Sequence, residues 1–315
     1  MNFEEILIIY HANCPDGMCA AWCANHFYTE AMERGEAEVT FYGATHGQSP
    51  PIKLVKKAHK TFILDFSYSR EDMIKISKLT ELKVLDHHVK AQEACQDLDF
   101  CEFDLNRSGA GIAWDYFFPD VERPWLVDYI ETRDIWQWKW PNAEEALAYV
   151  DTLPRNFMTY DKIFNGTISL AECVEKGKPV KAYIKTVIEE TIEACLRHIT
   201  FQAPDGSMYV DVPIVNGNCK QISELINYFA PGHLFGLGYF RRKDGKYQYS
   251  IRVPEDSPFD GNKFAGLYGG GGHKKAAGFQ LYRELEELPV EDADCGESEW
   301  QGYKISGCGR KIKGK

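Results

Sequence analysis

The sequence predicts an α/β protein with two domains. Short apolar runs that alternate with helical segments are typical of βαβ units and of a parallel sheet. The run Ile6–Tyr10 is followed by a polar loop and by small and apolar residues at helical spacing over Met18–Trp22. Beyond about residue 200 the period becomes that of strands, and Asp244-Gly245 separates two alternating runs as a hairpin turn does. We therefore expect a parallel-sheet N-terminal domain joined by a helical connection to a smaller α/β C-terminal domain.

The N-terminal part carries the elements of the parallel sheet. Apolar runs predict four strands, at Ile6–Tyr10, Val39–Tyr42, Thr61–Phe66 and Lys83–Asp86. A helix over Arg70–Leu79 separates the last two strands, and a helical region runs from Ser108 to Trp136.

A long helical pattern over Ile168–Ile199 predicts the connection between the domains, with a break at Gly177-Lys178-Pro179. Beyond it, strands are expected over Met208–Val215 and on both sides of Asp244-Gly245, with a helix over Gln221–Phe229. The expected segments are a catalytic domain at 1–155, a helical linker at 156–200, a substrate-binding domain at 201–285 and a polar tail at 286–315.

Composition limits the function classes. The 315 residues are 44% hydrophobic and 26% charged, ordinary values for a globular protein. A net charge of −11 argues against tight wrapping of long nucleic acid, because that affinity comes from Lys and Arg on phosphates. Short phosphorylated substrates remain compatible, since a bound cation can supply positive charge. With no apolar run of about 20 residues and no basic leader, the chain is expected in the cytoplasm, away from membranes. Ten cysteines without a Cys-x-x-Cys pair are expected to be free thiols.

Acids and histidines stand at the ends of three predicted strands. His11 and Asp16 follow the first strand, Asp65 lies at the end of the third, and Asp86-His87-His88 ends the fourth. The carboxyl ends of parallel strands lie on one edge of the sheet, so these side chains should converge. Carboxylates mixed with imidazoles suit Mn²⁺, Fe²⁺, Zn²⁺ or Mg²⁺, and Mn²⁺ best combines oxygen and nitrogen ligands. Without a cation the acids would repel one another.

Asp134 is a further candidate ligand. It lies between Arg133 and a cluster formed by Trp136, Trp138 and Trp140. The alternative for Asp134 is a helix-end acid paired with Arg133. The tryptophans either stack on bases or pack at a domain boundary.

The run Gly269–Gly272 is the main signal of the C-terminal part. Consecutive glycines allow backbone N–H groups to converge on an anion, and His273, Lys274 and Lys275 add donors and positive charge. A flexible linker is the alternative. The tight run Ala276–Phe279 that follows favours a phosphate site.

In these motifs the chain resembles the DHH phosphoesterase superfamily, in the nanoRNase/RecJ-like branch with a DHH-associated C-terminal domain. The N-terminal motifs occur in the family's order, as His11–Gly17, Asp65, Asp86-His87-His88 and Asp134. The glycine run before His273 resembles the signature of the associated domain, and the resemblance extends to about residue 285. The family includes oligoribonucleases, RecJ-like exonucleases, cyclic-dinucleotide phosphodiesterases and inorganic pyrophosphatases; the glycine-rich second domain sets this chain apart from the last group.

The resemblance implies roles for individual residues. Asp65 would bridge two metal ions, Asp86 would orient an imidazole, and His88 would meet the scissile phosphate or protonate the leaving group. Closure of the second domain would bring its substrate-binding residues to the metals, which would activate water and stabilise the developing charge. The implied metal ligands are His11, Asp16, Asp65, His87 and Asp134. The expected substrate-binding residues are Arg252, Gly270, Gly271, Gly272 and His273.

The first motif departs from the family pattern of a histidine and two aspartates. Only Asp16 is present, and Asn13 and Cys14 stand where another acid is usual. If Asp16 is the second aspartate, one metal site is complete, and the other keeps His11 and Asp65 with Asn13 as a neutral oxygen ligand. We therefore expect one tight and one weaker metal site. Alignment on Pro15-Asp16 would instead make Asp16 the first aspartate, and the sequence leaves both alignments open.

The expected function is a metal-dependent phosphodiesterase that hydrolyses short oligonucleotides or linear dinucleotides to nucleoside monophosphates. One alternative is a cyclic mono- or dinucleotide phosphodiesterase. Another is a catalytically degenerate module that binds nucleic acid or protein. The acid missing from the first motif favours this alternative. The sequence leaves open RNA or DNA preference, polarity of degradation, the choice between monomer and homodimer, and a cellular or viral source.

Overall fold

The computed structural model describes residues 3–288, 298–300 and 303–305. The chain divides into two compact units, Met1–Ala182 and Tyr183–Lys315. The division falls inside the segment that was expected to be the helical linker. Within the described residues, no helix is both long enough and apolar enough to cross a membrane. The eight cysteines of the described segments are free, as expected.

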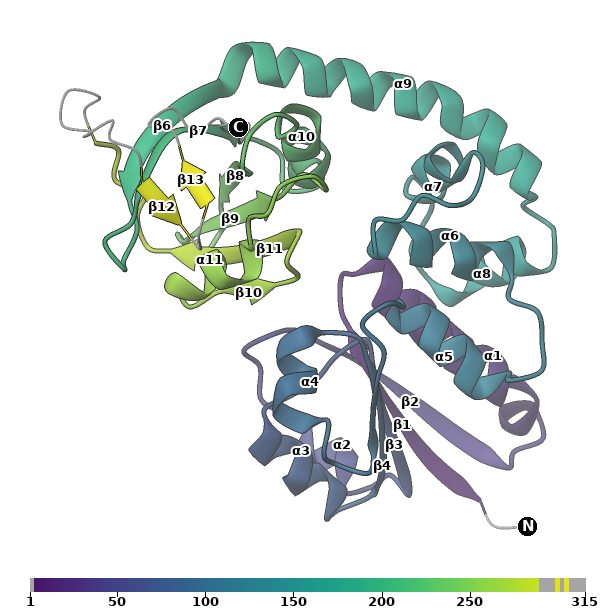
Figure 1. Ribbon diagram of the computed structural model, residues 1–315. Helices are drawn as coiled ribbons and strands as arrows, with labels where there is room; N and C mark the ends of the chain where they lie inside the picture. Colours follow the sequence, from purple (N-terminus) through teal and green to yellow (C-terminus); the bar gives the residue numbers. More distant parts are fainter. Residues whose placement is uncertain (1–2, 289–297, 301–302, 306–315) are drawn as a thin grey trace. The chain divides into compact units, whose positions relative to one another are not determined.

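Unit 1 contains a five-stranded sheet in which every neighbouring pair is parallel (Figure 1). The strand order is β2-β1-β3-β4-β5. The prediction of a parallel sheet is therefore confirmed. The strands are β1 (Glu4–His11), β2 (Ala37–Ala44), β3 (Lys60–Leu64), β4 (Glu81–Asp86) and β5 (Cys101–Phe103).

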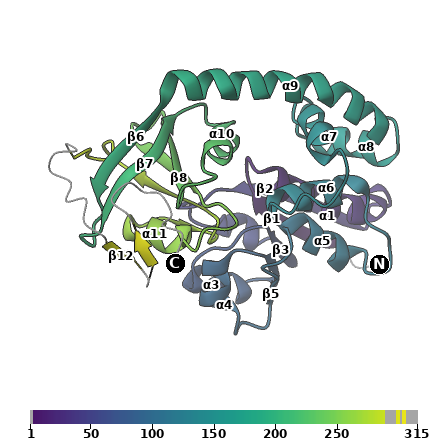
Figure 2. The ribbon, with the colours of Figure 1, turned by 45° about the horizontal axis from the view of Figure 1, so that its top comes forward.

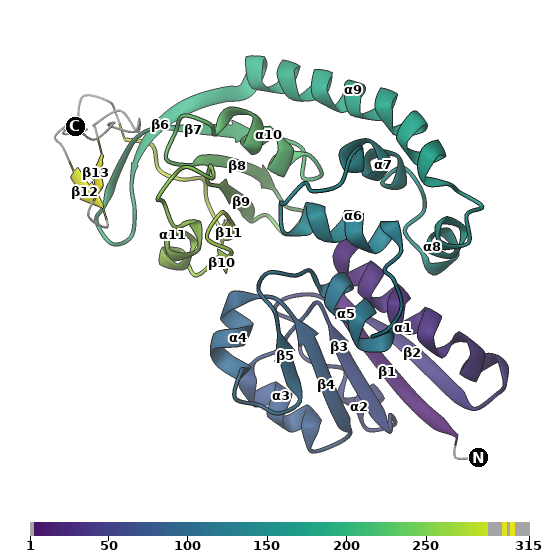
Figure 3. The ribbon, with the colours of Figure 1, turned by 45° about the vertical axis from the view of Figure 1, so that its right-hand side comes forward.

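Helices cover both faces of this sheet (Figures 1 and 3). The side chains of β1 alternate between the two faces of the sheet. Because both faces are buried, the apolar run of this strand is continuous. Ile6 and Ile8 pack with α1 (Pro15–Glu33) and α5 (Gly109–Phe117). Leu7 and Ile9 pack in the core on the other face. That face carries α2 (Ile52–Val55), α3 (Arg70–Ser77) and α4 (Val89–Cys95).

Four more helices follow α5 along the chain: α6 (Trp125–Asp134), α7 (Ala143–Val150), α8 (Phe157–Phe164) and α9 (Leu170–Cys195). The expected break at Gly177-Lys178-Pro179 is wrong, because α9 continues through Pro179. Gly177 lies so close to α7 that a Cβ there would meet the Glu145 carbonyl oxygen at 1.7 Å. Lys181 pairs with Glu145 at 2.8 Å, so α9 is held against α7 on both sides of the proline. The glycine is thus a packing position rather than a helix end.

Unit 2 contains a six-stranded mixed sheet with the order β10-β11-β9-β8-β7-β6. Only β7 and β8 pair in parallel within this sheet. The helix expected as far as Ile199 ends at Cys195, because the following residues pair with β7 as strand β6. The strands are β6 (Leu196–Gln202), β7 (Met208–Asn216), β8 (Gly236–Arg241), β9 (Tyr247–Arg252), β10 (Gly271–Gly272) and β11 (Ala276–Leu281).

Two helices pack on the mixed sheet. Helix α10 (Ile222–Phe229) lies against β7 and β8 (Figure 2), and its core includes Val215. Helix α11 (Gly261–Leu267) packs in a second core that includes Ile214, so the two helices cover opposite faces. A short antiparallel pair, β12 (Ser298–Trp300) and β13 (Tyr303–Ile305), falls within the expected polar tail. The rest of that tail beyond residue 288 lies outside the described residues.

Candidate metal centre

The carboxyl ends of the parallel strands bring the expected side chains together. His11 is the last residue of β1, Asp65 follows β3, and Asp86 is the last residue of β4, with His87 and His88 next in the chain. Since β1, β3 and β4 are neighbours in the sheet, these residues share one edge.

Asp65 and His87 form the centre of the cluster. The Nε2 atom of His87 lies 3.1 Å from Asp65 Oδ1, and both side chains are buried. Asp65 has a φ of 54°, in the left-handed region that Asp and Asn tolerate best among residues with a side chain. Gly109, at the start of α5, lies so close that a Cβ there would be 2.4 Å from Asp65 Cβ. The backbone on both sides therefore fixes the position of this carboxylate.

Asp16 and Asp134 complete a ring of carboxylates around His87. Asp16 Oδ2 lies 3.9 Å from His87 Nε2, and Asp134 Oδ2 lies 3.5 Å from the same atom. Asp16 also accepts backbone hydrogen bonds from Gly109 and Ala110 at 2.7 and 3.0 Å, so the N-terminus of α5 holds it in place. The ligand atoms of Asp16, His87 and Asp134 all lie within 4.8 Å of one another.

The alternative for Asp134, a helix-end acid paired with its neighbour, is not what the structure contains. Arg133 pairs with Asp151 at 2.8 Å. The nearby tryptophans divide into two kinds: Trp138 packs against the core, while Trp136 and Trp140 are 41% and 44% exposed. Trp136 also contacts Trp138 edge to face, and stacking of the exposed pair on bases stays a prediction.

Asp86 holds the backbone and ring of the histidines that follow it. Its Oδ1 accepts a hydrogen bond from the His87 backbone N–H at 2.8 Å and lies 2.7 Å from His88 Nδ1. Its Oδ2 accepts a hydrogen bond from Ser67 at 2.6 Å. Asp86 is fully buried, so its contact with Nδ1 orients the His88 ring.

A second set of ligand atoms lies on the other side of Asp65. The buried Oδ2 atom of Asp65 lies 3.4 Å from His11 Nδ1. It makes no hydrogen bond of standard geometry to any described residue. Ligand atoms of His11, Cys14 and Asp65 lie within 4.8 Å of one another. The neighbouring Asn13 is exposed, has a φ of 61°, and accepts a hydrogen bond from Arg155 at its carbonyl oxygen. Its expected place as a metal ligand stays a prediction.

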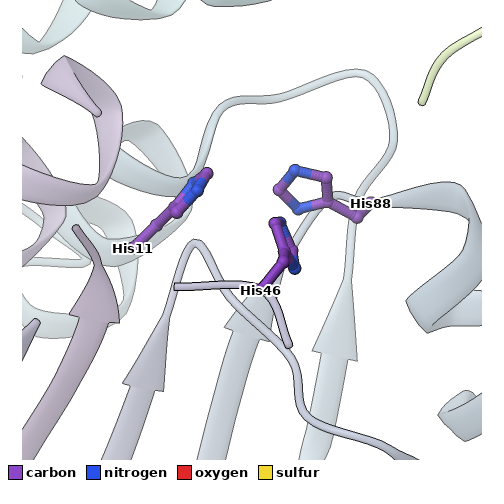
Figure 4. Close-up of side chains that lie close together, drawn as sticks. All are labelled: His11, His46 and His88. Carbon is purple, nitrogen blue, oxygen red and sulfur yellow. The ribbon is translucent and has the colours of Figure 1, made fainter. Parts of the chain in front are cut away.

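The sequence reasoning missed His46 as a site residue and left Cys14 among the free thiols. The rings of His11, His46 and His88 gather above the strand ends (Figure 4), with ligand nitrogens within 4.8 Å of one another. His46 follows β2 by two residues, so the rule that identified the other strand ends also applies to it. Cys14 directly precedes α1 in the first motif.

Comparisons with known proteins support the fold. No protein-family model matches the chain. An uncharacterized protein of Acanthamoeba polyphaga mimivirus is 27% identical over 311 residues, which cover 94% of this chain and 72% of that protein. An exopolyphosphatase-related protein from Bacteroides fragilis superimposes with a TM-score of 0.51 at 11% identity, covering 90% of this chain and 88% of that one. Exonuclease RecJ bound to manganese superimposes with a TM-score of 0.50 at 13% identity, covering 88% and 86%.

Both solved structures are DHH superfamily proteins. This chain has the DHH-type two-domain fold. The fold implied by the Asp-His-His segment and by the glycine run is therefore confirmed.

The charged groups of the centre shift one another's pKa values. Burial and the charges of Asp65 and Asp134 raise the pKa of Asp16 well above its ordinary value. Burial opposes ionisation of Asp65, but its contacts with His11 and His87 outweigh burial and hold the pKa of Asp65 below its ordinary value. Burial likewise disfavours the imidazolium of His87, yet Asp65 and the other carboxylates outweigh it and raise the pKa of His87 to about 10. A protonated His87 thus supplies the positive charge among the acids.

Burial and neighbouring charges also shift the pKa values of His88, Cys14 and His46. Burial disfavours the imidazolium of His88, but the contact with Asp86 outweighs it, and the pKa of His88 is raised. Burial, followed by the charge of Asp65, raises the pKa of the Cys14 thiol well above its ordinary value. Burial and the neighbouring imidazoles lower the pKa of His46.

The residues present fit a divalent cation. Carboxylates and imidazoles from separate elements surround one small volume, and such sets bind Mn²⁺, Zn²⁺ or Mg²⁺. The buried Asp65 Oδ2 lacks a hydrogen bond among the described residues, as expected of an atom that has a metal for its partner. Asp16, Asp65, His87 and Asp134 would hold one ion, and His11 with Asp65 would hold another.

Unit 2 places the expected substrate-binding side chains at one end of its sheet. Arg252 ends β9 and lies opposite Ala276 of β11, while the His273 N–H donates to the Ala276 carbonyl oxygen at 2.7 Å in the turn before β11. The Arg252 guanidinium donates to Ser223 Oγ at 2.5 Å. Burial lowers the pKa of Arg252 to about 10, so it stays charged at neutral pH.

The glycine run forms a tight hairpin edge. The backbone N–H groups of Gly269, Gly270 and Gly272 donate hydrogen bonds to acceptors in residues 262–266. A Cβ on Gly270 would lie 2.2 Å from the Gly278 carbonyl oxygen, so close packing requires glycine there. The expectation that these three N–H groups converge on an anion is wrong, because they already have acceptors. A contact between the glycines and a substrate through other atoms stays a prediction.

Proposed function

We propose that this protein is a metal-dependent phosphodiesterase that hydrolyses short oligonucleotides or linear dinucleotides to nucleoside monophosphates. The observation that carries the proposal is the ring of Asp16, Asp65 and Asp134 around His87 Nε2, with distances of 3.9, 3.1 and 3.5 Å. Asp16 and Asp65 are buried and Asp134 is partly exposed, and carboxylates at such separations favour a cation between them. The solved RecJ exonuclease, whose fold this chain shares, is bound to manganese, and we propose Mn²⁺ here as well.

The protein residues hold the reacting groups in place. Asp65 lies between His11 and His87 and presents one carboxylate oxygen to each side, so it is placed to bridge two ions. Divalent ions held by these residues would activate water for attack and would stabilise charge on the phosphoryl oxygens. Asp16 is fixed by the N-terminus of α5 and keeps the geometry from relaxing when substrate enters.

His88 is the proposed proton donor. Its Nδ1 lies 2.7 Å from the buried Asp86 carboxylate, which raises the pKa of His88 and favours the imidazolium. A charged imidazole at the strand ends can contact a phosphate oxygen or protonate the departing ribose oxygen. Asp86 acts through His88 and is a positioning residue.

The substrate is proposed to be short because positive charge is scarce. The chain carries 36 Lys and Arg residues against 47 Asp and Glu residues. Tight binding of long nucleic acid depends on many Lys and Arg contacts to phosphates, which this balance does not favour. Arg252 and His273 of unit 2 are the proposed phosphate contacts on the substrate.

Hydrolysis of 5′-labelled short RNAs and of cyclic dinucleotides, with Mn²⁺ or EDTA, tests the proposal. Disappearance of dinucleotide with Mn²⁺, and its persistence in EDTA and in Asp65→Asn, is the expected result. Asp97→Asn, which removes an exposed carboxylate of the same unit, should retain activity. Turnover of cyclic dinucleotides alone would favour the cyclic phosphodiesterase, and no turnover with any metal would favour the binding module.

A further inference from the structure

We propose that Cys14 is a thiolate ligand of the cation held by His11 and Asp65, and that this subsite prefers softer divalent ions such as Zn²⁺ or Co²⁺. The inference rests on the proposed function in one respect, namely that a metal binds at the strand ends. It goes beyond that function because it gives the two metal positions different ligand chemistry.

Two observations support the subsite. Ligand atoms of His11, Cys14 and Asp65 lie within 4.8 Å of one another, close enough for one ion to contact all three. The Oδ2 atom of Asp65 belongs to a residue only 1% exposed, and its contact with His11 Nδ1 at 3.4 Å lacks the geometry of a hydrogen bond. A cation between the two atoms would satisfy both of them and would also suit the sulfur of Cys14.

The backbone fixes where Cys14 lies. It is the N-cap residue of α1, its side chain forms no capping hydrogen bond, and Pro15 follows as the first helical residue. On its other side, the Asn13 carbonyl is bonded to Arg155. The dipole of the 19-residue helix α1 only partly offsets the burial that disfavours a thiolate in the metal-free protein, so the bound cation must supply the rest.

The three side chains offer one nitrogen, one sulfur and one oxygen ligand. Zinc sites in enzymes commonly use three protein ligands and keep a fourth position for water or substrate. When the ion binds, the thiol proton leaves to solvent and a sulfur lone pair forms the bond to the metal, so no oxidant or reductant is needed. His46 and His88, which lie with His11 in Figure 4, border this position.

The metal position around His87 offers a different set of ligand atoms. Asp16, Asp65 and Asp134 with His87 give three carboxylates and one imidazole, a set suited to Mn²⁺ or Mg²⁺. Thiolate ligands shift preference toward Zn²⁺ and related ions. The protein should therefore bind two kinds of ion at once, with Asp65 shared between them.

Absorption spectroscopy of the Co²⁺-loaded full-length protein tests the thiolate directly. Sulfur-to-cobalt charge transfer gives a strong near-ultraviolet band, whereas nitrogen and oxygen ligands alone give only weak visible bands. We expect the strong band in the wild type, its loss in Cys14→Ser with the visible bands retained, and its persistence in Cys101→Ser. Cys101 is the matched control because it is a half-buried free thiol of the same unit.

Metal competition gives a second readout. Cys14→Asp replaces the thiolate by a carboxylate, so the ratio of Zn²⁺ to Mn²⁺ affinity at this position should fall by at least about tenfold. An unchanged ratio, or a strong band that survives in Cys14→Ser, would overturn the assignment. Binding of Co²⁺ without the strong band in the wild type would overturn the thiolate and leave the phosphodiesterase intact. No binding of any divalent ion would overturn both.

Discussion

The Nε2 atom of His87 lies 3.1 Å from Asp65 Oδ1, and this contact joins the ends of strands β4 and β3. Both groups are buried, and Asp16 and Asp134 add two more carboxylates within 4 Å of the same nitrogen. Since the pKa of His87 is raised to about 10, the ring carries a proton at neutral pH in the metal-free protein. The positive charge of this imidazolium offsets the negative charge of the carboxylates, as the charge of a bound metal ion would.

Metal binding should therefore release a proton from His87. A coordinating imidazole is neutral, and at any pH below about 10 the ring must lose its proton first. The apparent metal affinity should rise by up to about tenfold for each pH unit between 6 and 8. Calorimetry in buffers of different ionisation enthalpy measures the protons released. An affinity that is flat across this range would contradict the charge assignment of His87.

Asp65→Asn should remove most of the metal affinity without unfolding the protein. Asn tolerates the left-handed φ of 54° at this position, so the backbone need not move. The change deletes the charge shared by both ligand sets, and we expect activity to fall by more than about 100-fold, beyond the loss typical of outer-shell changes. Metal analysis after dialysis and thermal unfolding measure the two effects. Equal metal content in Asp65→Asn and Asp97→Asn would contradict the bridging role.

Much of the site was predictable because parallel strands place their ends on one edge. His11, Asp65 and Asp86 were each found as a polar residue closing an apolar run, and the sheet order puts β1, β3 and β4 side by side. Asp134 was harder to judge, since Arg133 beside it suggested an ion pair. Only the contact of Arg133 with Asp151, 18 residues along the chain, resolves that choice.

Other features depend on contacts that sequence spacing does not contain. Gly177 looked like a helix break, but its partner is a carbonyl of α7, 32 residues earlier. The glycines before His273 looked like an anion loop, but the N–H groups of Gly269, Gly270 and Gly272 have acceptors in α11. Cys14 resembled a buried thiol until the fold placed it beside His11. In each case the deciding neighbour comes from another element.

Asp86→Asn should move the pH dependence of activity. The contact with Asp86 raises the pKa of His88, so loss of that charge lowers it and reduces the fraction of imidazolium at neutral pH. The alkaline limb of the kcat/KM profile should shift to lower pH, with activity at pH 7 reduced by about 10–100-fold. Asp97→Asn should leave the profile unchanged. A loss of activity that is equal at every pH would indicate that Asp86 is structural and does not tune His88.

Gly109→Ala should damage the centre by steric pressure alone. The added methyl would lie 2.4 Å from Asp65 Cβ, and the same residue donates its N–H to Asp16 Oδ2 at 2.7 Å, so both carboxylates must shift. We expect a loss of about 1–3 kcal/mol in the free energy of unfolding together with weaker metal binding. Gly266→Ala is the control, because a Cβ there meets nothing within 4 Å and alanine suits a helix better than glycine. Urea unfolding and metal titration of the two variants measure the difference. A lower free energy of unfolding with unchanged metal affinity would show that the start of α5 supports the fold but does not position Asp65 and Asp16.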